Sequence, residues 1–104
     1  MIEIEVIVPV QADLAQAEQL IEQCCAAEGL LISLKGSLAS YPGCIHWHYK
    51  QGTQRGTLEI TLWPKAGRIW FSVHSGRTAA WIEEAVARLK ETLEKNLALN
   101  ERER

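Results

Sequence analysis

Three segments in the middle of the chain alternate apolar and polar residues with a period of two: 44–50, 57–63 and 68–74. In an extended strand, successive side chains point to opposite faces of a sheet, so this alternation indicates strands with two chemically different faces. The connections between them, residues 51–56 and 64–67, are too short for a crossover between parallel strands. The pattern therefore predicts a three-stranded antiparallel meander, which the rest of the chain must cover on at least one face.

The remaining elements are predicted from the same kind of periodicity. Strands are expected over residues 2–8 and 30–35, and helices over 12–28 and 79–96, where apolar residues recur every three or four positions. The resulting order, β-α-β-β-β-β-α, predicts an α+β fold: a two-layer sandwich with a mainly antiparallel sheet and two helices packed on one face. This order resembles the TATA-binding-protein-like topology. The resemblance concerns element order only, so it implies no functional residue.

The length and composition are typical of one globular domain. The chain has 104 residues, of which 47% are hydrophobic and 23% are charged. We predict a single domain over residues 1–98 and a charged flexible tail over 99–104. We find no signal peptide pattern and no apolar run near the ~20 residues of a membrane span, so we expect a cytoplasmic protein without membrane contact. Three cysteines, two of them adjacent, are more typical of free thiols than of a disulfide framework.

The two faces of the predicted meander differ in chemistry. The face toward the helices is apolar, with residues such as Trp47, Ile60 and Phe71. The outward face carries all three histidines of the chain and two of its four tryptophans. Any function of the chain is therefore expected on this outward face.

The short turn between the last two strands predicts a register in which Glu59 lies opposite Ser72. The longer first connection leaves two possibilities, with His48 opposite either Thr57 or Glu59. Both possibilities bring one polar patch together on the outward face: His46, His48, Glu59, Ser72 and His74.

Self-association is the function that the sequence favours for this face. Aromatic and arginine side chains are enriched in interface cores, and symmetric dimers are the commonest assembly. Residues 1–34 hold six acidic and no basic residues, whereas 35–77 hold six basic and one acidic residue, which favours contacts between copies. We therefore expect a non-catalytic, homodimeric binding or assembly module without a cofactor. Its predicted interface residues are His46, His48, Glu59, Trp63, Arg68, Trp70 and His74.

A metal site on the same face is the alternative. Two histidines separated by one residue on a strand share a face, and zinc sites use such pairs with a third ligand from a neighbouring strand. The candidate ligands are Cys44, His46, His48 and His74, with Glu59 nearby. The chain would then be a small zinc protein or enzyme. Because it contains no nucleophile elbow, Walker loop or dinucleotide-binding fingerprint, the sequence favours a non-catalytic protein.

An anionic ligand is a further possibility. The chain passes from the last predicted strand into a helix N-terminus, where free N–H groups favour an anion. The predicted anion-binding residues are Ser75, Gly76, Arg77 and Thr78. Aromatic side chains among Lys and Arg on an open sheet also suit stacking on single-stranded nucleic acid. The net charge of −2 and the lack of an RNA-binding motif make nucleic acid the less favoured partner.

Overall fold

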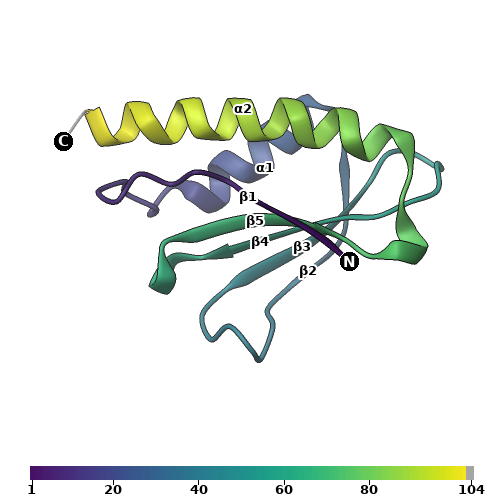
Figure 1. The fold of residues 1–104 in the computed structure, drawn as a ribbon, viewed down its shortest axis with the longest axis horizontal. Coiled ribbons are helices and arrows are strands. Elements are labelled where there is room, and N and C mark those ends of the chain that lie inside the picture. The colour runs from purple at the N-terminus through teal and green to yellow at the C-terminus, as the bar shows by residue number, and fades with distance from the viewer. Residues whose placement is uncertain (103–104) are drawn as a thin grey trace.

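The computed structural model describes residues 1–102 and confirms the predicted fold. A five-stranded antiparallel sheet carries both helices on one side, in two layers (Figure 1). The strand order across the sheet is β1-β5-β4-β3-β2, so the meander β3-β4-β5 occupies its middle. The elements are β1 (Ile2–Glu5), α1 (Ala17–Ala27), β2 (Leu31–Gly36), β3 (Ile45–Lys50), β4 (Leu58–Trp63), β5 (Arg68–Val73) and α2 (Ala80–Arg102), with 3₁₀ turns η1 (Pro64–Ala66) and η2 (Ser75–Arg77).

The strand registers agree with those predicted from the turns. Between β4 and β5, Glu59 pairs with Ser72 and Thr61 pairs with Trp70. Between β3 and β4, His48 pairs with Glu59, which resolves the two possibilities left by the longer connection. Because both pairings are antiparallel and in register, alternate residues of all three strands share the same face.

The hydrophobic core lies between the sheet and the two helices. Trp47, Ile60 and Phe71, one on each meander strand, are fully buried there, as predicted. The helices contribute apolar side chains at helical spacing, which close the core from the other side. The principal helix residues in this core are Ile21, Cys25, Ile82, Leu89, Leu93 and Leu97.

Two predicted boundaries near the start of the chain are wrong. β1 ends at Glu5 rather than at residue 8, and α1 begins at Ala17 rather than at residue 12. Beyond β1 the backbone turns toward α2, where the Ile7 N–H donates a hydrogen bond to Glu94 Oε2 at 2.8 Å. Asp13 Oδ1 accepts a hydrogen bond from the backbone N–H two residues later, at 2.9 Å, and such a local turn competes with helix formation.

A bulge in β2 changes which of its side chains lie on each face. The register between β2 and β3 shifts between Ile32 and Leu34. Leu34 therefore pairs with His48 on the outward face, and Lys35 pairs with Trp47 on the helix side. Strict alternation over the predicted strand 30–35 would instead place Leu34 on the same face as Leu30 and Ile32, toward the helices, and Lys35 on the outward face. Lys35 Nζ instead lies 2.6 Å from two carboxylates of α1.

Helix α2 is longer than predicted and continues to Arg102. It therefore includes the first four residues of the predicted tail 99–104, while residues 103 and 104 lie outside the described residues. None of the helices in the described part of the chain combines the length and the apolar run that crossing a membrane requires.

Candidate functional site

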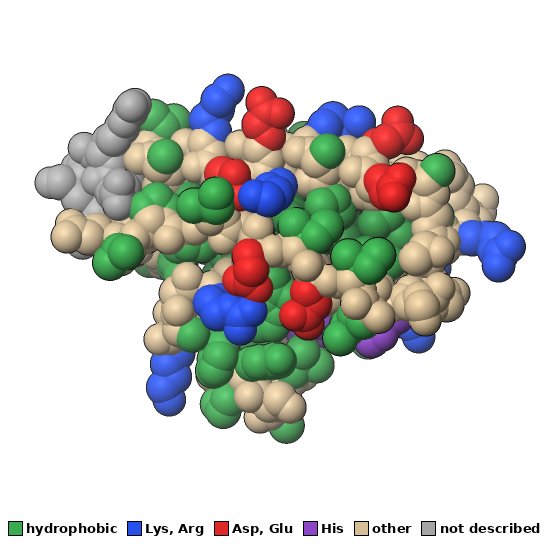
Figure 2. All heavy atoms as spheres, in the orientation of Figure 1, with side chains coloured by type: hydrophobic (Ala, Val, Ile, Leu, Met, Phe, Trp, Pro, Cys, Tyr) green, Lys and Arg blue, Asp and Glu red, His purple; other side chains and the backbone are tan. Residues whose placement is uncertain are grey.

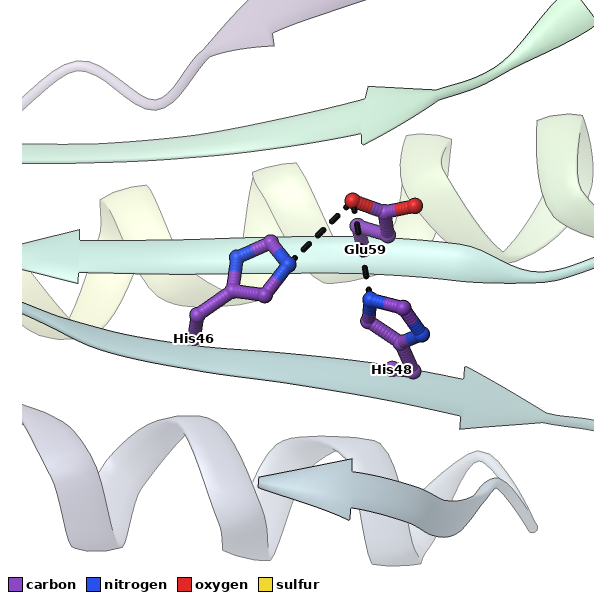
Figure 3. Close-up of side chains that lie close together, drawn as sticks. All are labelled: His46, His48 and Glu59. Atoms are coloured by element: carbon purple, nitrogen blue, oxygen red, sulfur yellow. Dashed lines mark ion pairs between the residues drawn. The ribbon is translucent and has the colours of Figure 1, made fainter. Parts of the chain in front are cut away.

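Three side chains meet on the outward face where β3 runs beside β4. His46 and His48 project from β3, and Glu59 projects from β4 between them (Figure 3). Glu59 Oε1 lies 3.2 Å from His46 Nε2 and 3.7 Å from His48 Nε2. One donor atom from each of the three residues lies within 4.8 Å of the others. Alternation along β3 and the β3-β4 register together produce this cluster.

The second oxygen of the same carboxylate has its own partners. Glu59 Oε2 lies 3.3 Å from His74 Nε2 and 3.8 Å from a terminal nitrogen of Arg77. These two side chains follow β5 and reach the cluster from the opposite side to β3. Contacts to both oxygens fix the plane of the carboxylate and direct Oε1 toward the two imidazoles.

His46 is held by a hydrogen bond through its other ring nitrogen. Nδ1 lies 2.8 Å from Thr61 Oγ1, and with Nδ1–H as the donor, Nε2 presents its lone pair toward Glu59. His46 is only 6% exposed and Glu59 only 5%. Burial lowers the pKa of the His46 imidazole below its ordinary value of 6.5, because desolvation of the charged form outweighs the attraction of Glu59. At neutral pH His46 is therefore in the neutral form that binds metal ions.

The two oxygen–nitrogen distances in the cluster are close to those around a bound metal ion. In a tetrahedral zinc site with ligand bonds of about 2.0–2.1 Å, two ligand atoms lie about 3.3–3.4 Å apart. The 3.2 Å and 3.7 Å separations in the cluster bracket that value. The hydrogen bond that the Nδ1–H of His46 donates to Thr61 Oγ1 is also the arrangement that orients histidine ligands.

Cys44, another predicted ligand, lies apart from this cluster. It precedes β3 and is buried, and its Sγ accepts a hydrogen bond from the Leu38 N–H at 3.3 Å. The cluster consists of His46, His48 and Glu59, with no thiol among the described candidate ligands. His74, also predicted, approaches the other carboxylate oxygen instead.

The aromatic end of the outward face is covered by the chain itself. Tyr41, in the loop between β2 and β3, packs edge-on against Trp63 and Trp70, with ring centroids 5.0 Å and 5.1 Å apart. The guanidinium of Arg68 lies over the Trp70 ring, 4.2 Å from its centroid, and pairs with Glu5. Trp70 is therefore only 3% exposed, and a partner cannot contact it without displacing Tyr41 or Arg68.

Two of the four predicted anion-binding residues reach the cluster. Gly76 and Arg77 line a shallow cleft of about 670 Å³ whose floor includes His46, His48 and Glu59. The other two, Ser75 and Thr78, do not line this cleft.

Sequence reasoning missed Thr61 as a member of the site. The signal was present in one of the two registers left open for the first connection, because the pairing of His48 with Glu59 also places Thr61 opposite His46. Leu34 was missed because the bulge in β2, which brings it to the cleft, has no mark in the alternation.

The other hollows formed by the described residues lack comparable chemistry. A groove of about 660 Å³ runs between β1 and α2, and apolar side chains gather there beneath the long helix (Figure 2). A hollow of about 830 Å³ beside η1 contains the carboxylates of Asp13 and Glu18 but no imidazole or thiol. The candidate site is therefore the cluster on the outward face.

Comparison of the chain with protein-family models, with curated proteins and with solved structures finds no match.

Proposed function

We propose that the protein is a small metal-binding module that holds one divalent ion through His46, His48 and Glu59. The observation that carries this proposal is the convergence of His46 Nε2 and His48 Nε2 on a single carboxylate oxygen, at 3.2 Å and 3.7 Å. Three protein ligands of this kind leave at least one coordination position for water or a further ligand, as in zinc sites that are not purely structural.

Zinc is the ion that we propose. Imidazole nitrogens and a carboxylate oxygen are donors that suit zinc, and the two oxygen–nitrogen separations are close to those of its tetrahedral sites. The same donor set also suits ferrous iron. Elemental analysis of the purified protein identifies which of the two metals is bound. Finding iron would change the identity of the metal but not the three assigned ligands.

The experiment is a competitive zinc titration of the wild type and of three ligand variants, His46→Gln, His48→Gln and Glu59→Gln. Removing residues that only orient ligands typically weakens metal binding about 10–100-fold, so loss of a ligand should exceed about a hundredfold. Thr61→Val, which removes the hydrogen-bond partner of His46 but preserves the side-chain shape, should fall within that 10–100-fold range.

His74→Gln is the matched control, because it removes an imidazole that touches the same carboxylate but contacts the other oxygen. We expect its zinc affinity to stay within about tenfold of the wild type, the lower bound for an orienting residue. Wild-type protein that binds no zinc contradicts the proposal. Ligand variants that bind zinc as well as the wild type would contradict the assigned ligands.

Self-association is a second candidate function, and strand β2 favours it. All six residues of this edge strand are exposed, including the large apolar residues Leu31, Ile32 and Leu34. An edge strand of this kind offers unpaired backbone groups to another strand. We therefore place a homodimer contact at β2 rather than at Trp70. Light scattering should give a dimer mass for the wild type and a monomer mass for Leu31→Lys, and a monomeric wild type would contradict this placement.

We also propose a cytoplasmic location. It is supported by the three cysteines, Cys24, Cys25 and Cys44, all of which carry free thiols. Fractionation of cells that express the chain would test it, and recovery outside the cytoplasm would contradict it.

A further inference from the structure

The position that the three ligands leave open faces the cleft. His46, His48 and Glu59 all project from the same face of the sheet, so an ion bound by them lies above that face. The space above the ligands is the cleft of about 670 Å³, a size that suits a small molecule. A ligand that enters the cleft can therefore reach the ion directly.

The charges around the cleft favour an anionic ligand. Glu59 is the only acidic residue among the described residues that line it, and Arg77 lines it as well. A divalent ion, the carboxylate of Glu59 and the guanidinium of Arg77 together leave two positive charges uncompensated in the cleft. A neutral or cationic ligand would leave this excess in place, whereas an anion would reduce it.

Arg77 has donors free for such a ligand. A terminal nitrogen of its guanidinium lies 3.8 Å from Glu59 Oε2, while its side chain remains 53% exposed. A guanidinium carries five N–H donors in a planar fork that matches the oxygens of a carboxylate or phosphate.

On the basis of the metal site proposed above, we propose that the cleft binds a small oxyanion, a carboxylate or a phosphate group. One oxygen of the anion occupies the open position on the ion, and another accepts hydrogen bonds from Arg77. His46, His48 and Glu59 hold the ion, and Arg77 contributes to selectivity for the anionic group.

The test uses the full chain loaded with cobalt(II), whose visible absorption reports on its ligands. Inorganic phosphate and acetate are titrated separately at constant ionic strength, and the cobalt affinity of each protein is measured beforehand. We expect a saturable spectral change with at least one anion. Arg77→Gln should weaken that response about tenfold or more, as loss of a charged hydrogen bond does. The anion that binds more tightly identifies the preferred group.

Arg88→Gln is the control, because Arg88 has the same 53% side-chain exposure and pairs with Glu28, away from the cleft. It should respond to the anions as the wild type does. A cobalt protein whose spectrum changes with neither anion overturns the anion proposal and leaves the metal site intact, as does an Arg77→Gln response equal to that of Arg88→Gln. Failure to bind cobalt would overturn both proposals.

Discussion

The two faces of the β3-β4-β5 meander are both largely buried, yet they are built from opposite chemistry. Toward the helices, Ile60 and Phe71 are packed in an apolar core, and burial of such side chains stabilises the fold. On the outward face Glu59, Thr61 and Ser72 are also buried, although burying polar groups costs free energy unless they are paired. Burial on the helix-side face therefore stabilises the fold and offsets the free-energy cost of the polar cluster on the outward face. Functional sites commonly carry such a cost.

The largest expected effect of a substitution lies on the helix side. Phe71→Ala removes a fully buried ring from the core between the sheet and the helices, and it leaves a cavity there. We expect the free energy of unfolding to fall by about 3–5 kcal/mol, measured by urea denaturation. A loss below about 1 kcal/mol would show that the two faces are assigned the wrong way round.

The covered end of the outward face should behave almost like the core. Trp70 is packed beneath Tyr41 and Arg68, so Trp70→Ala should lower the free energy of unfolding by about 3 kcal/mol. The sequence interpretation expects a dimer surface there, where a substitution would change the oligomer mass and leave the monomer stable. Denaturation and light scattering on the same variant separate these outcomes.

The polar cluster should contribute much less to stability. Glu59→Gln preserves the shape of the side chain, and its amide oxygen can still accept a hydrogen bond, but without the negative charge of the carboxylate. In metal-free protein we expect a loss of about 1 kcal/mol, as for one net hydrogen bond. If the loss instead equalled that of Phe71→Ala, the cluster would stabilise the fold in the absence of any metal ion. That result would favour a structural role for the cluster over metal binding.

The smallest effect is expected for the partly exposed ion pair between Glu22 on α1 and Lys35 on β2. The pKa of Glu22 is lowered below its ordinary value of 4.5, mainly by a hydrogen bond from Lys35 and to a smaller extent by one from Trp47. A carboxyl group whose pKa is lower in the folded state than in the unfolded state stabilises the protein at pH values above its unfolded-state pKa. This contribution disappears as the pH falls through the folded-state pKa. Glu22→Gln should therefore lower the free energy of unfolding by about 0.5 kcal/mol at pH 7. In strong acid its stability should equal that of the wild type, and a difference that persisted there would contradict the assigned charge pair.

The sequence predicts the meander and most of its site because both depend on local rules. Alternation assigns the faces of the strands, and the short η1 turn sets the register that places Glu59 beside Ser72. The patch of His46, His48, Glu59 and His74 follows from these two facts. Short antiparallel hairpins leave few other arrangements of the same residues.

The rest depends on contacts between distant segments, which periodicity does not encode. The early end of β1 follows a hydrogen bond between Ile7 and Glu94, 87 positions apart. The cover of Tyr41 over Trp70 and the hydrogen bond from the Leu38 N–H to the Cys44 thiol depend on the conformation of a loop without a repeating pattern. For this reason the sequence analysis predicts a larger exposed area on the outward face than the structure has. It also includes Cys44 among the candidate metal ligands, although Cys44 lies apart from the cluster.

X-ray absorption at the zinc edge of zinc-loaded wild-type protein tests the central claim most directly. Imidazole and carboxylate ligands lie at about 2.0–2.2 Å from zinc, whereas a thiolate lies at about 2.3 Å. We predict a first shell of nitrogen and oxygen only, with the outer scattering of two imidazole rings, from His46 and His48. A sulfur ligand would contradict the account, since it would place Cys44 or another thiol on the ion. A shell of water oxygens without imidazole scattering would contradict it as well.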